Sequence, residues 1–483
     1  MIGASRAWRS APVDARDVRL AIIAPALVLL GYYVVSDLRV SVAAVGALTL
    51  AAWGAFAFSR PRLALFLSLP MLFLAGTKFR SRYADDTLEG LLDAQVIFEL
   101  VLFAFIGVAV VAVALAVRTG RRMSKAEALI AIFTTLALMS TLWSAAPALS
   151  LVRATQLAIV AAFAVLSVRI LGRAGALWTT SRSLAWYVLV CAFITIAAPW
   201  TTLPLFAEEG VFRFRWFAIH PLDAATLTGA AAIGLLGIIA CARTQDIPAR
   251  PGVGIRVMFL VMVVLLVLTS SRGPMVALAA GIGLMWLIRV RPAFRAAAVL
   301  IVSAGVLASV VYVSELRSWV EGIAAQDSAA TRLFLRNQTV DDVFQLNGRL
   351  ELWQELRPIV AEHFVAGTGY QASRAALLDV AEWAAYAHNA LLQTVLDLGV
   401  VGMLSMLGLI FLGFRAGLDR SNPAWVRATV PALMLFLTLN SMSNESFAAA
   451  PDIELFLVFL CALCAASGHP RAHLQASGAP ASS

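Results

Sequence analysis

One histidine and several arginines border long apolar stretches of this sequence. His388 lies in "AYAHNALLQ", Arg272 in "LTSSRGPMVAL", and Arg213 and Arg215 in "VFRFRWF". Guanidinium groups bind phosphate oxygens through paired hydrogen bonds and remain charged. A histidine can take a proton from a hydroxyl group. We therefore expect a group to leave a lipid-linked pyrophosphate held by the arginines and to join a hydroxyl that His388 deprotonates.

Three further residues are predicted to contact the substrate. Arg153 begins an apolar stretch, and Arg349 and Tyr370 lie in a long polar segment that also contains tryptophans. The aromatic rings of that segment either stack on sugars or form the core of a folded loop. Arginines near the ends of membrane spans often only anchor lipid headgroups, and this alternative stays open for Arg153.

Asn389 follows the histidine and is predicted to bind the substrate with it. Gln393 and Asp397 come four and eight residues later, so the three polar side chains share one ridge of a helix. For Gln393 and Asp397 we expect hydrogen bonds to a neighbouring helix. A single histidine at a helix start is more often an interface residue than a base, so this motif alone does not decide the role of His388.

The elements that hold these residues are predicted to be membrane-spanning helices. The 483 residues are 61% hydrophobic and 13% charged, whereas soluble domains are about half apolar and about a quarter charged. The apolar residues form blocks of about 17–25 residues, the length that crosses a bilayer. Because each span must satisfy its own backbone hydrogen bonds, the prediction is an all-α polytopic membrane protein with about 12–14 transmembrane helices. The candidate spans run near residues 18–35, 40–58, 61–76, 94–117, 126–143, 151–171, 183–199, 221–241, 254–270, 274–290, 295–313, 387–413, 427–442 and 453–466.

The placement of arginine and lysine predicts the orientation of these helices, because basic residues concentrate in cytoplasmic loops. Clusters such as "RTGRRMSK", "RVRPAFR" and "RAGLDRSNPAWVR" fall on one side if the N-terminus is cytoplasmic. An even number of spans returns the C-terminus to that side. The net charge of +9 then reflects topology, and nucleic acid is not an expected partner. His388 and the arginines face the outer side.

One long polar segment divides the predicted helices into two groups. Residues 1–313 form the first part of the transmembrane bundle, and residues 387–466 form the last part. Residues 314–386 form a large outer loop directly before the His-Asn helix. Loops longer than about 15 residues are usually functional or disordered, and a helical pattern over 348–364 favours an ordered cap. Residues 467–483 are predicted to be a disordered cytoplasmic tail.

Neither a metal ion nor a cofactor is expected from the sequence. The outer loops contain adjacent carboxylates at Asp85, Asp86, Glu208 and Glu209, but no DxD pair. The CxxC formed by Cys461 and Cys464 lies in an apolar run, where cysteines are expected to pack as small hydrophobic residues.

Five segments in a fixed order resemble the O-antigen ligase and polysaccharide polymerase superfamily, which includes Wzy-type and ExoQ-like polymerases. They are "STLWSAAPALSLVRA", "FRWFAIHPLDAATLTG", "LTSSRGPMVAL", "NGRLELWQELRPIVAEHFVAGTGY" and "AHNALLQTVLDLGVVG", and they cover most of residues 140–405. By position, Arg272 matches the arginine of the family's SRG turn, and His388 matches the histidine of its HN motif. Arg215 or its neighbour Arg213 matches the arginine ahead of the family's proline-asparagine span start, where this sequence has "HPLD".

The resemblance implies an inverting, metal-independent glycosyl transfer at the periplasmic face of a bacterial inner membrane. The donor would be a glycan on undecaprenyl pyrophosphate, and the other partners would be membrane lipids and a glycan or lipid A–core acceptor. A polymerase would extend exopolysaccharide, capsule or O-antigen repeat units, whereas an O-antigen ligase would transfer the glycan to lipid A–core. The sequence "NGRLELW" followed by "GTGY" resembles the polymerases more, so polymerisation is the first expectation. A flippase or transporter of lipid-linked sugars is a third alternative, although the mid-span positions are largely apolar.

Overall fold

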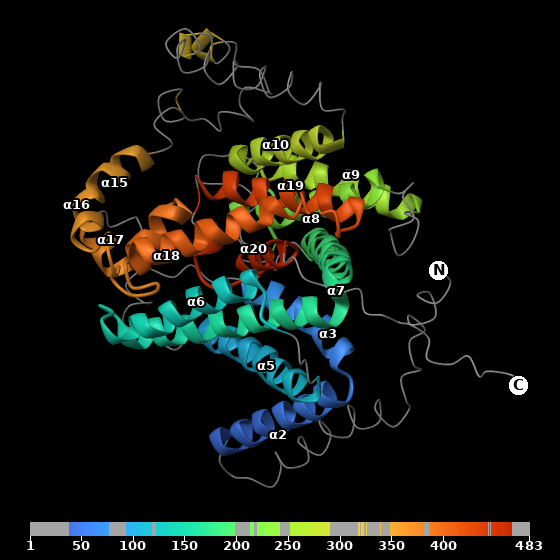
Figure 1. Ribbon diagram of the computed structural model, residues 1–483, viewed down its shortest axis with the longest axis vertical. Coiled ribbons are helices and arrows are strands. Elements are labelled where there is room, and N and C mark those ends of the chain that lie inside the picture. The colour runs from blue at the N-terminus through green and yellow to red at the C-terminus, as the bar shows by residue number, and fades with distance from the viewer. Residues whose placement is uncertain are drawn as a thin grey trace, which may run out of the picture. The chain divides into compact units, whose positions relative to one another are not determined.

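The computed structural model describes most of the predicted helices and all of the candidate site residues. The described residues are 38–76, 93–117, 122–198, 213–216, 220–241, 252–289, 317–318, 320–322, 325, 339, 348–380, 386–442, 444 and 446–465. All regular secondary structure within these ranges is helical (Figure 1). The spans predicted near 18–35 and 295–313 and the tail at 467–483 lie outside the described residues.

Within the described ranges, the α-helices follow the predicted spans closely, and the short helices α15, α16 and α17 lie in the long polar segment. They are α2 (Leu38–Ser59), α3 (Pro61–Ala75), α5 (Ala94–Ala116), α6 (Lys125–Met139), α7 (Pro147–Ala197), α8 (Pro221–Ala240), α9 (Val253–Leu268), α10 (Arg272–Arg289), α15 (Arg349–Glu355), α16 (Arg357–Glu362), α17 (Arg374–Val380), α18 (Ala390–Arg415), α19 (Ala424–Ser441) and α20 (Ile453–Leu463).

Several of these helices can cross a membrane. Five are long and apolar enough to do so: Ala94–Ala116, Lys125–Leu142, Pro147–Ala197, Pro221–Ala240 and Ala390–Arg415. Shorter apolar helices cover Val45–Ser59, Pro61–Ala75, Val253–Leu268 and Ile453–Leu463. The protein is an all-α polytopic membrane protein, as its composition predicts.

The described helices form two compact units. In the first unit, α2, α3 and α5 pack on one another, and Trp53 Nε1 donates a hydrogen bond to the Phe105 carbonyl at 2.8 Å. The second unit contains the helices from α6 onward. All of the candidate site residues belong to the second unit.

α7 contains two spans joined at a glycine. Its 51 residues run without an intervening loop, but Gly172 has φ 72° and ψ 164°, so the helix breaks there. A residue without Cβ adopts this left-handed φ at little steric cost. The sequence predicted separate spans near 151–171 and 183–199, whereas the second helical stretch begins directly after the break.

α19 lies among α8, α10 and α18 (Figure 1). Near its end, Asn440 Nδ2 donates to Thr226 Oγ1 of α8 at 2.9 Å, and the Met442 carbonyl accepts from Asn389 Nδ2 at 3.3 Å. The starts of α8 and α18 therefore lie beside the end of α19. We call this end of the second unit the His388 end.

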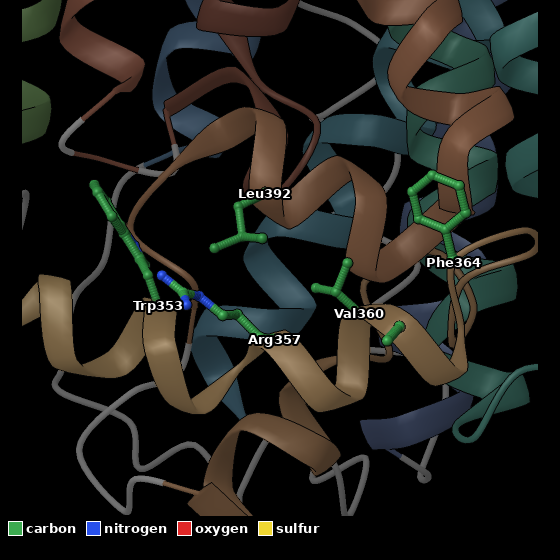
Figure 2. Close-up of a pocket in the computed structure, with 6 residues that line it drawn as sticks. Trp353, Arg357, Val360, Phe364 and Leu392 are labelled. Carbon is green, nitrogen blue, oxygen red and sulfur yellow. The ribbon is translucent and has the colours of Figure 1, made fainter.

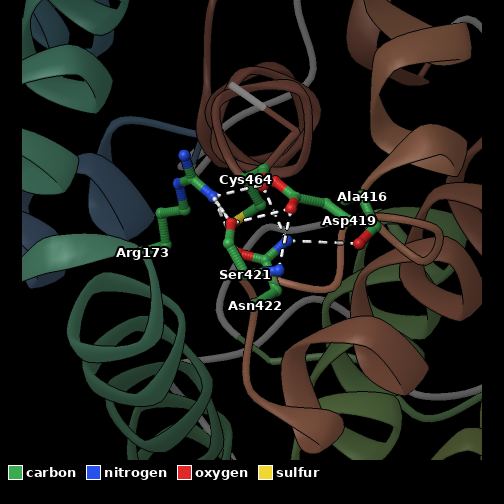
Figure 3. A network of polar contacts seen from close by, with 6 residues as sticks. All are labelled: Arg173, Ala416, Asp419, Ser421, Asn422 and Cys464. Atoms are coloured by element: carbon green, nitrogen blue, oxygen red, sulfur yellow. Dashed lines mark hydrogen bonds and ion pairs between the residues drawn. The ribbon is translucent and has the colours of Figure 1, made fainter. Parts of the chain in front are cut away.

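A polar network closes the opposite end of the second unit (Figure 3). Arg173, next to the break in α7, pairs through Nη1 with Asp419 Oδ2 at 3.1 Å and with Asn422 Oδ1 at 3.0 Å. Asn422 Nδ2 donates to the carbonyls of Ala416 and Cys464 at 3.2 and 2.8 Å. These contacts fix α7, the α18–α19 connection and the end of α20 to one another.

Candidate functional site

His388 lies immediately before α18 on a constrained backbone. Its φ is 49°, a left-handed conformation that is uncommon outside glycine and often occurs at functional sites. The preceding residue is fixed on both sides: Ala387 N donates to Gln393 Oε1 at 2.9 Å, and the Ala387 carbonyl accepts from Trp353 Nε1 at 2.8 Å. His388 as a whole is half-buried.

Asn389 caps the helix that follows the histidine. Its Oδ1 accepts hydrogen bonds from Leu391 N and Leu392 N, both at 3.1 Å, which satisfies backbone groups that a helix start leaves without intrahelical partners. Its Nδ2 bonds to α19, and the side chain is buried. This placement favours a structural role for Asn389 over the substrate contact expected from the sequence.

Gln393 and Asp397 bond to the polar segment before α17 as well as to each other. Gln393 Nε2 donates to Ser373 Oγ at 2.7 Å and to Asp397 Oδ1 at 3.1 Å. Gln371 Nε2 donates to Asp397 Oδ2 at 3.4 Å. All four side chains are buried. The expected hydrogen bonds to a neighbouring helix are thus made mainly to a loop.

Residues 363–373, which we call the docked segment, lie against a break in α18. The break is at Gly399, with φ 65° and ψ −167°. A helical Val400 N would bond to the carbonyl four residues earlier, at Leu396. Instead, Val400 N donates to the Phe364 carbonyl at 2.7 Å, and the Leu396 carbonyl accepts from Thr368 N at 2.8 Å.

The docked segment therefore replaces the hydrogen bonds that the break removes. Gly369 N likewise donates to the Asp397 carbonyl at 3.0 Å. Irregular backbone at membrane depth is tolerated where protein buries it and satisfies its polar groups. These hydrogen bonds hold the docked segment at a fixed position along α18, further from the start of the helix than His388.

The α6–α7 connection holds the other side of the docked segment. Ser140 Oγ accepts from Tyr370 N at 2.9 Å, and Ser150 Oγ donates to the Tyr370 carbonyl at 2.8 Å. Ala145 N donates to the Thr368 carbonyl at 3.1 Å. The motif "STLWSAAPALS" thus supplies serines that clamp the backbone, a role that sequence reasoning missed.

Tyr370 lies inside the protein, beside Arg153. It is 3% exposed, and its ring packs edge-on against Phe133 with centroids 6.5 Å apart. Burial and the nearby charge of Asp397 raise the pKa of the Tyr370 hydroxyl, while the Arg153 charge opposes this shift. Arg153 Nη1 also donates to Gln156 Oε1 at 2.8 Å. These positions favour a packing and positioning role for Tyr370 over stacking on a sugar.

Arg272 begins α10 directly after a buried turn. The segment that contains Arg213 and Arg215 runs beside this turn: Phe214 N donates to the Leu268 carbonyl at 2.8 Å, and Arg213 Nε approaches the Thr269 carbonyl at 3.5 Å. The structure therefore brings the three arginines to one turn, although about 60 residues separate them in the sequence.

The turn that Arg213, Arg215 and Arg272 share, which we call the arginine turn, also belongs to the His388 end. Ser271 Oγ lies 3.5 Å from the carbonyl of Pro221, the first residue of α8, and the start of α8 bonds to the end of α19. Burial lowers the pKa of the Arg215 guanidinium, which nevertheless stays charged because arginine ordinarily titrates far above neutral pH. The arginine turn and His388 thus flank the same end of α19.

Arg349 and the short helices α15–α17 cover the start of α18. Arg349 is the first residue of α15, one turn before Trp353. Beneath these helices lies an apolar cluster of Leu352, Leu356, Leu377, Ala387 and Leu396. The helical pattern predicted over 348–364 contains α15 and α16.

Metal ligands do not gather at this end within the described part of the chain. No group of three or more His, Cys, Asp and Glu side chains is placed there to hold a metal ion. The cysteines at 191, 241, 461 and 464 are buried free thiols.

Most of these candidate site residues lie in a segment that matches a known protein family. Residues 257–407 match the family model described as O-antigen ligase. The match includes Arg272, Arg349, Tyr370, His388 and Asn389. A search of curated proteins found no match. The arginine turn, the docked segment and the His-Asn helix start thus lie in or beside the segment that matches this family model, and the match supports an assignment to the superfamily of O-antigen ligases and Wzy-type polymerases.

Proposed function

We propose that this protein transfers a glycan from undecaprenyl pyrophosphate to a sugar hydroxyl at the periplasmic face of a bacterial inner membrane. One observation carries the proposal: a constrained histidine and three arginines from distant parts of the sequence lie at one end of a membrane helix bundle that includes an O-antigen ligase domain. A membrane glycan ligase or polymerase is the activity that this family indicates.

His388 is the proposed general base. The acceptor hydroxyl gives its proton to the imidazole while its oxygen attacks the anomeric carbon of the donor sugar. The bond from that carbon to the pyrophosphate oxygen breaks, and undecaprenyl pyrophosphate leaves with the bonding electrons. Attack opposite the leaving group inverts the anomeric configuration. The hydrogen bonds of Ala387 and Asn389 hold the backbone of His388 at the start of α18. Proton transfer requires the imidazole to lie within hydrogen-bond distance of the acceptor hydroxyl.

The arginines at the turn before α10 are proposed to hold the pyrophosphate. Arg272 and one or both of Arg213 and Arg215 would donate paired hydrogen bonds to its oxygens, as guanidinium groups do. Their charges offset the negative charge that grows on the leaving group. In this proposal the arginines serve as the counter-charge, so the reaction needs neither a metal ion nor a cofactor.

The acceptor distinguishes two versions of this function. Polymerisation of exopolysaccharide, capsule or O-antigen repeat units is the version that the "NGRLELW" and "GTGY" segments favour. Ligation to lipid A–core is the second version, because the matching family model is described as O-antigen ligase. Both versions use the same donor and the same base.

Reconstitution with a defined donor tests the proposal. Purified protein in nanodiscs would receive a glycan on undecaprenyl pyrophosphate, together with either a second lipid-linked repeat unit or lipid A–core. We expect glycan transfer to one acceptor, with release of undecaprenyl pyrophosphate. Movement of intact donor across liposomes without transfer to either acceptor would instead identify a flippase and overturn the proposal.

A further inference from the structure

An open groove lies between the short helices α15–α16 and the first turn of α18 (Figure 2). Its volume is about 480 Å³, within the range of ligand sites, and its lining residues are Trp353, Arg357, Val360, Ala361, Phe364 and Leu392. Arg357 is the one charged residue in this lining. We call this feature the α16 groove.

The two ends of the α16 groove differ in character. Figure 2 shows the Arg357 guanidinium beside Trp353 at one end and Phe364 at the other. Trp353 Nε1 bonds to the carbonyl of Ala387, the residue before His388. The charged end of the groove is therefore anchored next to the proposed base, while Leu392 lies one helical turn after it.

The apolar end leads away from His388 along α18. The Phe364 carbonyl accepts from Val400 N, so this end lies level with the break in α18 at Gly399. Phe364 and Val365 are 46% and 70% exposed. Further along α18, Val401 and Leu404 are 45% and 59% exposed. In a membrane helix, such side chains form an apolar path that lipid chains contact.

This polarity fits an amphiphile with an anionic head beside His388 and a long apolar chain. Arg357 is exposed and makes no ion pair within the part of the chain that the structure describes. Resting on the function proposed above, we propose that the α16 groove receives the donor lipid. The phosphate nearest the polyprenyl chain would contact Arg357, and the first isoprenoid units would lie between Val360, Ala361 and Leu392.

An ordinary phospholipid fits the α16 groove less well than the donor. The charged end of the groove lies beside the base, where the sugar of the donor has to be presented. A donor bound along the groove would place its pyrophosphate at the His388 end and its chain in the bilayer. The arginines near α10 would then hold the pyrophosphate from the other side of the end of α19.

Lipid binding by the full-length protein tests this inference separately from catalysis. Radiolabelled undecaprenyl diphosphate would be titrated against wild type, Arg357→Gln and Ala361→Trp in detergent. Loss of a charge-assisted hydrogen bond should weaken binding roughly ten- to a hundredfold for Arg357→Gln. Ala361→Trp should weaken binding at least about tenfold by filling the groove, without changing charge.

Two matched controls lie outside the groove. Arg256→Gln removes an exposed charge at the start of α9, and Ala279→Trp adds the same ring to an exposed position of α10. Both should bind the lipid like wild type. Melting temperatures would show that all four variants are folded.

A photoreactive residue at position 364 gives an independent measurement. It should crosslink to undecaprenyl diphosphate more than the same residue at Val276, which is 66% exposed on α10. Unchanged binding in both groove variants, or equal displacement of the probe by phosphatidylglycerol, would overturn the inference. Groove-dependent binding without any glycan transfer by wild type would instead leave the lipid site standing and remove the proposed function.

Discussion

Replacing Gly367 by alanine should undock the segment that supports the His-Asn helix start. Gly367 has φ +69°, and a Cβ at this position would collide with the carbonyl group of Asp397. Both atoms of that group belong to the backbone of α18, so no flexible side chain can move aside. The variant therefore has to displace either the docked segment or the helix.

The expected cost follows from the contacts that would be lost. A left-handed conformation costs a non-glycine residue about 1–2 kcal/mol. Displacement also removes the bonds from Thr368 N and Thr368 Oγ1 to the Leu396 carbonyl, at 2.8 and 3.0 Å, and from Gly369 N to the Asp397 carbonyl, at 3.0 Å. At about 0.5–1.5 kcal/mol for each of these three bonds, the total is about 2.5–6.5 kcal/mol.

Thermal unfolding, limited proteolysis and glycan transfer together test this estimate. Gly367→Ala should lower the melting temperature, expose residues 363–373 to protease and reduce transfer. The matched control is Gly283→Ala on α10, where an added Cβ meets nothing within 4 Å; alanine is favoured over glycine in a helix by roughly 0.5–1 kcal/mol. A Gly367→Ala protein that melts and transfers like Gly283→Ala would refute the proposed clamp.

Three further predictions address the arginines, the metal requirement and the opposite end. Arg272→Lys should impair transfer nearly as much as Arg272→Ala, roughly ten- to a hundredfold, because an ammonium lacks the planar fork; full activity in the lysine variant alone would show that charge suffices. Transfer should persist in EDTA, and activity that returned only with added magnesium or manganese would contradict the proposed role of the arginines. Burial alone would raise the pKa of Asp419, but hydrogen bonds from Ser421 and the charge of Arg173 hold this pKa below its usual value. The ionised carboxylate therefore stabilises the fold at a pH above the pKa that Asp419 has in the unfolded chain. This stabilisation is lost as the pH falls through the pKa that Asp419 has in the folded protein. Asp419→Asn should thus lower the melting temperature at pH 7, and its difference from wild type should shrink below about pH 4; a difference independent of pH would contradict this.

The membrane class and most helix positions could be predicted from the sequence because length and apolarity alone decide whether a segment can span a bilayer. The spans predicted near 94–117 and 221–241 lie within a few residues of α5 and α8. The extent of the second half of α7 could not be predicted in this way. Its early residues include arginines and serines, and hydropathy does not reveal a helix that resumes directly after the break at Gly172.

The break in α18, the role of Asn389 and the position of the arginines were not predicted, because they depend on contacts between residues far apart in the sequence. Gly399 in "DLGVVG" is indistinguishable from an ordinary helix glycine until the Phe364 carbonyl is seen in place of the normal acceptor. Asn389 was expected to contact substrate, although its position before an apolar run already matched the preference of asparagine for helix N-caps. The gathering of Arg213, Arg215 and Arg272 at one turn depends on tertiary packing, which motif order suggested but could not locate.

Glycan transfer by variants of His388 measures whether this histidine acts as the general base. Asparagine tolerates the left-handed backbone that His388 adopts but cannot act as the base, so His388→Asn separates chemistry from backbone strain, and His388→Ala accompanies it. Initial rates would be measured with purified proteins of equal melting temperature and a glycan on undecaprenyl pyrophosphate. If His388 is the base, both variants should bind the donor like wild type and lose about 100- to 10,000-fold in rate. Transfer at the wild-type rate by either folded variant would contradict the assignment of His388 as the base.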